Sequence, residues 1–145
     1  MAEPERLTTG SAIETEALGA HIAAGLEPGD LVLVLGEVGT GKTTLIRGAC
    51  RALGVEGPIT SPTFTIGRRH RGEACWVSHL DLYRLAGLEG EDPALLDDYL
   101  TPDSIAFVEW PAAATGRLAG PAVEARLSHA GGDRREIALI AASRR

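Results

Sequence analysis

The chain contains no asparagine and no glutamine, and Lys42 is the only lysine among its 14 Lys and Arg residues. Without asparagine, the N-K-x-D motif that reads guanine cannot occur. Without glutamine, no Ras-type side chain can orient an attacking water. An ordinary small GTPase is therefore disfavoured.

Cysteine, histidine and long apolar runs are also scarce or scattered. Cys50 and Cys75 form no C-x-x-C pair, which favours reduced thiols, and we expect the first in a helix and the second in a strand. The 4 histidines show no zinc-ligand spacing. No apolar run reaches membrane-spanning length, and the acidic Met1–Glu5 does not resemble a secretory signal. A net charge of −6 argues against a broad nucleic-acid surface. We therefore expect a cytoplasmic protein that binds neither membrane nor DNA.

The single lysine stands inside a glycine-rich loop. Gly36–Thr43 reads GEVGTGKT and matches the phosphate-loop (P-loop) pattern G-x-x-x-x-G-K-[ST]. Glycines let the backbone approach a phosphate, and successive N–H groups and the positive end of the next helix then face the anion. Lys42 should bridge the β- and γ-phosphates of ATP, and the Thr43 hydroxyl should ligate Mg²⁺. The predicted nucleotide-binding residues are Gly36, Gly39, Thr40, Gly41, Lys42, Thr43 and Thr44.

The sequence on both sides of the loop fits this interpretation. Residues 31–35 are typical of a buried parallel strand, and residues 43–53 carry apolar side chains at helical spacing. With 145 residues, the chain is expected to form a single P-loop ATPase domain over residues 1–145. A helix is expected over 11–26, with an apolar stripe of Ile13, Ala17, Ala20 and Ala24 flanked by Leu18, Ile22 and Leu26. Further expected elements are strands over 64–69 and 73–80, a short helix over 93–100, a strand over 104–109, and a hairpin of 122–128 and 136–142.

These elements predict an α/β fold. Hairpin-like strands beside a parallel nucleotide-binding core indicate a P-loop NTPase-like three-layer fold with a mixed central sheet. Arg68, Arg69 and Arg71 are expected at a tight basic turn around residues 69–72, either as a solvated hairpin tip or as a partner contact.

Two carboxylates follow expected strands and are candidates for catalysis. In open α/β sheets, chemistry gathers at the carboxyl ends of strands. Glu109 ends the more uniformly apolar strand and is the preferred metal ligand, whereas Asp81 is assigned to orienting or activating the attacking water, as a catalytic residue with Lys42. The two roles could be exchanged. His79 precedes Asp81 on the same strand face and is interpreted as a hydrogen-bonded core histidine. Trp110 packs over the edge of the site or in the core.

Four segments together resemble the bacterial TsaE (YjeE-like) family. They are Gly36–Thr44, Thr60–Phe64, His79–Leu85 and Val108–Pro111, in matching order and spacing over nearly the whole chain. The resemblance implies a small mixed-sheet ATPase that acts as an accessory subunit in making N6-threonylcarbamoyladenosine in tRNA. It also implies a TsaB-TsaD-like partner complex, through which tRNA is met only indirectly, and which ATP hydrolysis would reset between rounds.

The same resemblance implies roles for individual residues. Ser61 and Thr63 would belong to a switch-like segment near the γ-phosphate, and Thr43 and Glu109 would contact Mg²⁺. The stretch that includes Tyr83 and Arg84 would lie by the active site and the partner face, with Trp110 nearby. The family often has a Gly-Arg pair in its last hairpin, and here the matching candidate is Arg134, separated from Gly132 by Asp133.

Two other functions remain open at the level of sequence. A small-molecule P-loop kinase needs an acceptor pocket and usually a lid that carries arginine, for which this short chain has little material. A non-enzymatic nucleotide switch would bind ATP and signal by its shape alone. Asp81 favours turnover, but without glutamine or an evident arginine finger the isolated chain is expected to hydrolyse ATP slowly.

Overall fold

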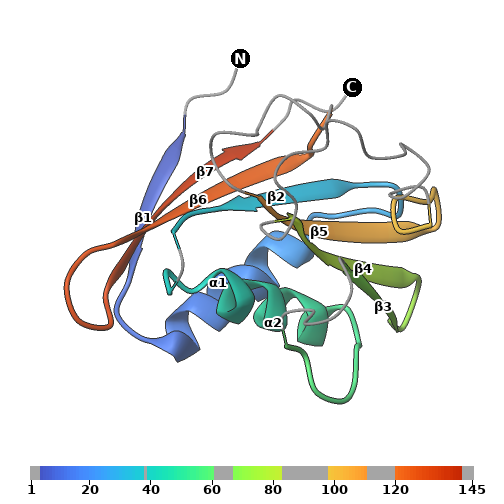
Figure 1. Ribbon diagram of the computed structural model, residues 1–145, viewed down its shortest axis with the longest axis horizontal. Helices are drawn as coiled ribbons and strands as arrows, with labels where there is room; N and C mark the ends of the chain where they lie inside the picture. The colour runs from blue at the N-terminus through green and yellow to red at the C-terminus, as the bar shows by residue number, and fades with distance from the viewer. Residues whose placement is uncertain (1–3, 38, 61–66, 83–97, 111–119, 142–145) are drawn as a thin grey trace.

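The computed structural model describes residues 4–37, 39–60, 67–82, 98–110 and 120–141, with only the backbone of Trp110. These residues form one sheet of seven strands in the order β1-β7-β6-β2-β5-β4-β3, with two helices (Figure 1). The elements in chain order are β1 (Glu5–Thr9), α1 (Ala12–Ala23), β2 (Leu31–Leu35), α2 (Lys42–Ala52), β3 (Gly67–Arg71), β4 (Trp76–Asp81), β5 (Ser104–Trp110), β6 (Val123–His129) and β7 (Arg135–Ala141).

The sheet is mixed, as the sequence predicts. Its centre is parallel, because β2 pairs in parallel with both β5 and β6, and β4 pairs in parallel with β5. The pairs β1–β7, β6–β7 and β3–β4 are antiparallel. The expected α/β fold of P-loop NTPase-like type is thus confirmed. The parallel strands β4, β5, β2 and β6 all end at one edge of the sheet, which is where ligands bind in open α/β sheets.

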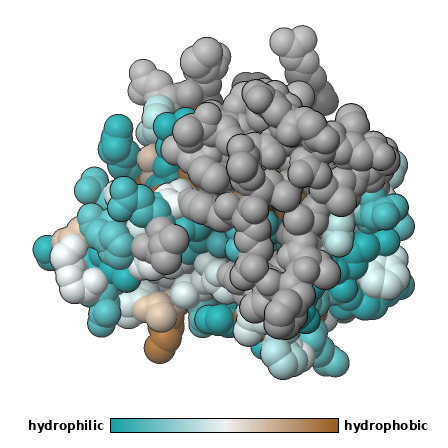
Figure 2. Space-filling view, viewed as in Figure 1, coloured by the Kyte–Doolittle hydropathy of each residue, from teal (hydrophilic) through white to brown (hydrophobic). Residues whose placement is uncertain are grey.

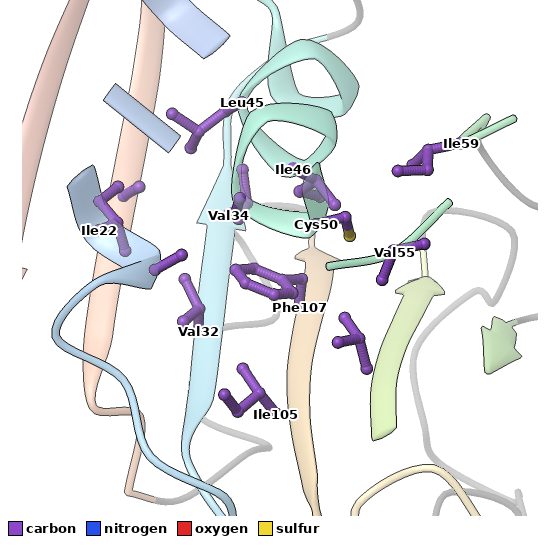
Figure 3. Packing of buried hydrophobic residues seen from close by; sticks show 14 of the residues in the cluster. Ile22, Val32, Val34, Leu45, Ile46, Cys50, Val55, Ile59, Ile105 and Phe107 are labelled. Atoms are coloured by element: carbon purple, nitrogen blue, oxygen red, sulfur yellow. The ribbon is translucent and has the colours of Figure 1, made fainter. Parts of the chain in front are cut away.

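Alternation along the central strands gives the sheet two buried faces. Val32, Val34 and Phe107 belong to the larger core cluster, which the two helices cover from one side of the sheet (Figure 1). Figure 3 shows the Phe107 ring between the β2 valines and α2. Leu33 and Val108, one position along, belong to a separate cluster on the other face. Burial on both faces explains why the central strands are continuously apolar rather than alternating.

The two helices approach each other closely through glycine. A Cβ atom on Gly19 would lie 2.0 Å from the Leu45 carbonyl oxygen, and one on Gly48 would lie 2.0 Å from the Glu16 carbonyl oxygen. No side chain fits at either position. This contact turns α1 so that Ile22 and Ala23 are buried, rather than the stripe expected from Ile13 to Ala24.

The expected stripe on α1 was therefore wrong. Ile13 is 78% exposed, and it is the only large hydrophobic side chain exposed among the described residues. The coloured part of the surface in Figure 2 is otherwise mostly hydrophilic. The spacing of apolar residues groups Ile13 and the alanines on one face of the helix. This spacing carries no information about the backbone contact through glycine, which buries a different face.

Two further expectations differ from the structure. The basic segment is not a turn: Arg68, Arg69 and Arg71 lie within β3, and the chain turns over residues 72–75. Arg69 and Arg71 on β3 lie over the ring of Trp76 on β4, with their Cζ atoms 4.8 and 5.2 Å from the ring centroid. Cys75 lies in that turn rather than in a strand.

The first strand was missed altogether. β1 pairs with β7 at the edge of the sheet, and its sequence ERLTT is too polar to be recognised before its partner is known. The expected helix over 93–100 falls mostly on residues 93–97, outside the described residues. Within the part of the chain that the structure describes, no helix has the length and apolar character needed to cross a bilayer.

Candidate nucleotide-binding site

The glycine-rich loop lies where the sequence places it, between the end of β2 and the start of α2. Gly41 is the residue that precedes the first turn of α2 and has φ +97°, a left-handed conformation that glycine adopts without strain. At Gly36, a Cβ atom would lie 2.5 Å from the Leu127 carbonyl oxygen on β6. The hydroxyl of Thr40 is buried and donates to the Glu37 carbonyl at 2.7 Å. Glycine is therefore required at Gly36 by the lack of space and favoured at Gly41 by the backbone conformation.

Lys42 begins α2 and points back into the loop. Its side chain is 6% exposed, and its Nζ donates to the carbonyl oxygens of Gly36 and Glu37, both at 2.8 Å. Burial lowers the pKa of the Lys42 ammonium, and the negative charges of Glu109 and Asp81 oppose this shift. The ammonium is thus held at the mouth of the loop and within electrostatic reach of both candidate carboxylates.

Asp81 and Glu109 come together at the carboxyl edge of the sheet. They are register partners in the parallel pair β4–β5, so their backbones lie side by side. Both stand on the strand face that carries Val77 and Phe107, which is the face covered by α2. Glu109 is buried at 4% exposed, whereas Asp81 is half-buried. The structure therefore brings both carboxylates to the same side of the sheet as Lys42.

His79 contacts Glu109 directly. Its Nε2 lies 2.6 Å from Glu109 Oε2, and its side chain is fully buried. This confirms the interpretation of His79 as a hydrogen-bonded core histidine. The partner, a candidate metal ligand, was not anticipated, because residues 30 positions apart show no pairing signal in one sequence.

The tip of the β6–β7 hairpin lies against the loop. A Cβ atom on Gly39 would be 3.9 Å from His129 Cε1, and the Arg135 guanidinium donates to the Gly39 carbonyl at 3.3 Å. Arg134, the candidate named from the sequence, is exposed and donates to the Ala130 carbonyl at 3.4 Å. The structure thus brings Arg135 rather than Arg134 to the loop, and sequence reasoning missed both Arg135 and His129. The sequence offered one signal for Arg135, which is its place at the start of the second strand of the hairpin.

Several other predicted site residues cannot be placed. Ser61, Thr63, Tyr83 and Arg84 lie outside the described residues, and so does the side chain of Trp110, whose backbone pairs with Leu35. Thr43 and Thr44 are half-buried in the first turn of α2, as expected.

The residues at this edge suit magnesium held jointly with phosphates. Among the described residues, no group of three or more His, Cys, Asp and Glu side chains could hold a metal ion by itself. Mg²⁺ typically takes one or two protein oxygens and completes its shell with water and substrate phosphates. The Thr43 hydroxyl and the two carboxylates are oxygen donors of this kind, so the residues present fit the ion.

Comparison with known proteins agrees with this geometry. A family model described as "Threonylcarbamoyl adenosine biosynthesis protein TsaE" matches residues 9–137. The chain belongs to the TsaE family. Membership connects it with threonylcarbamoyladenosine biosynthesis, as the resemblance seen in the sequence implies.

Individual relatives cover most of this TsaE-family chain. A Streptomyces coelicolor protein named tRNA threonylcarbamoyladenosine biosynthesis protein TsaE is 42% identical over 118 residues, 80% of each chain. The Bacillus subtilis protein of the same name is 34% identical over 132 residues, 91% of this chain and 82% of its own length. The crystal structure of Bacillus subtilis YdiB superimposes with a TM-score of 0.77 at 28% identity, covering 99% of this chain and 88% of that one.

Proposed function

We propose that this TsaE-family chain is a single-domain, Mg²⁺-dependent ATPase that acts with a TsaB-TsaD-like complex in the threonylcarbamoyladenosine modification of tRNA. The observation that carries the proposal is the placement of Lys42: its buried ammonium lies in the loop that precedes α2 and within electrostatic reach of Glu109 and Asp81. Family membership supplies the pathway. A cytoplasmic location is part of the same proposal.

The chain's own residues divide the work of binding. The loop backbone and the amino end of α2 present N–H groups to the phosphates, where the helix dipole also favours an anion. Lys42 places a positive charge between the phosphates. A bound phosphate would compete for this ammonium with the carbonyl oxygens of Gly36 and Glu37. Thr43 and Glu109 would hold the metal, which neutralises charge that develops on the phosphates.

Asp81 has the better position to act on water. It stands at the end of β4 and is half-buried, so solvent can reach it, whereas Glu109 is buried. A carboxylate that accepts a hydrogen bond from water can orient it and take up its proton as the water attacks the γ-phosphate. The isolated chain should be slow, because it contains no glutamine to assist this step.

The test compares phosphate release by the purified chain alone, with a TsaB-TsaD-like complex, and with candidate small-molecule acceptors. We expect slow release of inorganic phosphate by the chain alone and faster release with the complex. Phosphate transfer to an added metabolite, with turnover indifferent to the complex, would instead identify a small-molecule kinase. ATP binding with no turnover under any condition would identify a non-enzymatic switch. Absence of binding in every condition would refute the proposal.

A further inference from the structure

The buried contact between His79 and Glu109 has a function that packing does not explain. His79 is enclosed on the helix-covered face of the sheet, where Val77 precedes it by two residues and Phe107 is its register partner on β5. On its other sides, Asp81 follows it by two residues and Arg68 is its register partner on β3. An aliphatic side chain at position 79 could pack against Val77 and Phe107 without polar atoms to satisfy. A buried polar pair of this kind is a weak source of stability. The presence of His79 therefore points to a role at the group that it contacts, Glu109.

We propose that His79 is a positioning residue that donates a hydrogen bond from Nε2–H to Glu109 Oε2 and so fixes the orientation of this carboxylate toward a divalent cation. The inference deepens the proposed function and rests on it. Partners that orient ligating groups from behind are a general feature of metal sites, and their loss typically reduces metal affinity or activity by about 10–100-fold.

The direction of the hydrogen bond follows from the surroundings of the ring. His79 Nδ1 is buried and has no hydrogen-bond partner among the described residues. A proton on Nδ1 would be a buried donor without an acceptor, which is more costly than a bare nitrogen lone pair next to apolar groups. The ring therefore carries its proton on Nε2, where the Glu109 carboxylate at 2.6 Å accepts it.

The strand register explains why position 79 can do this. Asp81 is the register partner of Glu109, and His79 lies two residues earlier on the same side of β4. The contact is thus a diagonal one between neighbouring parallel strands, within reach of two long side chains. One strand consequently supplies both the half-buried carboxylate and the residue that holds the buried one. A change of register between β4 and β5 would lose both features together.

The experiment uses the full chain and measures binding of a non-hydrolysable ATP analogue by calorimetry over a range of Mg²⁺ concentrations. His79→Leu removes the donor, whereas His79→Gln keeps an amide N–H at a comparable distance along the side chain. We expect H79L to raise the half-saturating Mg²⁺ concentration by about 10–100-fold and H79Q to restore most of the difference. Binding of the analogue in EDTA should be the same in H79L, H79Q and the wild type. Glu109→Gln should raise the Mg²⁺ requirement, and adding H79L to E109Q should raise it no further.

Each other result overturns the inference. Equal Mg²⁺ requirements in H79L and wild type, with only a lower unfolding temperature, would mean that His79 is structural. A shift in H79L that H79Q does not reduce would mean that the N–H donor is irrelevant. If E109Q changes the Mg²⁺ requirement and H79L does not, the inference fails while the proposed function stands. If the wild-type chain binds no analogue at any Mg²⁺ concentration, the proposed function fails and takes this inference with it.

A spectroscopic measurement covers the case in which H79L does not fold. The ¹⁵N chemical shifts of His79 in the wild-type chain report its tautomer directly. We expect the Nε2–H form, with an Nε2 proton signal that changes when Mg²⁺ and the analogue bind together but not when the analogue binds in EDTA. An Nδ1–H tautomer, or a signal that does not respond to the metal, would contradict the positioning role.

Discussion

Asp81 and Glu109 are register partners at the carboxyl ends of two hydrogen-bonded parallel strands, yet only Glu109 is buried, at 4% exposed. Equivalent backbone positions therefore give two carboxylates in different environments. Differences of this kind assign different roles to paired acids in many enzymes. Here they favour a metal ligand that is held from behind and a second acid that solvent can reach.

The difference predicts distinct effects for two amide substitutions. Asp81→Asn should reduce ATP hydrolysis by about 10²–10⁴-fold, the usual contribution of a general base, and should leave nucleotide affinity nearly unchanged. Glu109→Gln should instead raise the Mg²⁺ concentration needed for binding. Phosphate release in the presence of the partner complex and metal titration of binding measure the two effects. The opposite pattern would exchange the roles of Asp81 and Glu109.

Lys42 should contribute to binding rather than to folding. Lys42→Ala removes a charged donor for the phosphates, which is worth about 1.5–3 kcal/mol or at least tenfold in Kd, and it also removes the cost of burying an ammonium. We therefore expect a smaller rise in unfolding temperature on adding Mg-ATP than in the wild type.

Arg47→Ala is the control for Lys42→Ala. Arg47 carries the same charge on the same helix, but it pairs with Glu16 at 3.6 Å on the side that faces α1. Its nucleotide-linked thermal shift should match that of the wild type. A K42A variant that is stabilised by Mg-ATP as strongly as R47A would contradict the assigned role of Lys42.

The close approach of α1 and α2 should make Gly48 intolerant of any side chain. An alanine in a helix is ordinarily about 1 kcal/mol more favourable than glycine, but here its Cβ would lie 2.0 Å from the Glu16 carbonyl. Because Cβ is attached rigidly to the backbone of α2 and the carbonyl belongs to the backbone of α1, the helices would have to separate. We expect Gly48→Ala to lower the free energy of unfolding by about 3 kcal/mol, at the upper end of overpacking effects, as measured by urea denaturation.

Gly25→Ala provides the matched control. Gly25 follows α1, and among the described residues a Cβ atom there would meet only the Ile22 carbonyl oxygen, at 3.8 Å. The free energy of unfolding of G25A should stay within about 0.5 kcal/mol of the wild-type value, as for most substitutions away from packed sites. Similar losses in G48A and G25A would show that the contact between the helices is not what limits position 48.

His70 should make the fold sensitive to mild acid. Burial lowers the pKa of this β3 histidine below 6.5, and the nearby His79 on β4, Arg68 on β3 and Arg51 on α2 lower it further. Between that lowered pKa and 6.5, the unfolded chain binds more protons than the folded chain, so stability falls as the pH falls through this window. Above 6.5 the loss is absent.

The measurement compares urea midpoints of the wild type and His70→Gln from pH 7.5 to pH 5. The stability of the wild type relative to H70Q should decline on acidification, because glutamine has no proton to gain. His21→Gln is the control, since His21 is exposed on α1. A constant difference between wild type and H70Q across this range would rule out the contribution of His70.

Sequence reasoning succeeded where neighbouring residues carry the whole signal. The strand before the loop, the helix after it and the β6–β7 hairpin were all expected within a few residues of their bounds. It failed where a partner decides the outcome. β1 is polar and becomes a strand only by pairing with β7, and α1 turns Ile13 to solvent because two glycines let its backbone contact α2.

The sequence by itself determined the phosphate loop, since Gly36–Thr43 is one continuous segment whose glycine spacing and single lysine directly encode a backbone shape and a charge. Only the tertiary structure decided which side chains support the loop and the carboxylates beside it. Glu109 meets His79 across 30 positions, and Arg135 rather than Arg134 reaches Gly39 across 96 positions. Contacts of this kind depend on strand order and register, which are set by the burial of the whole sheet and not by any local pattern.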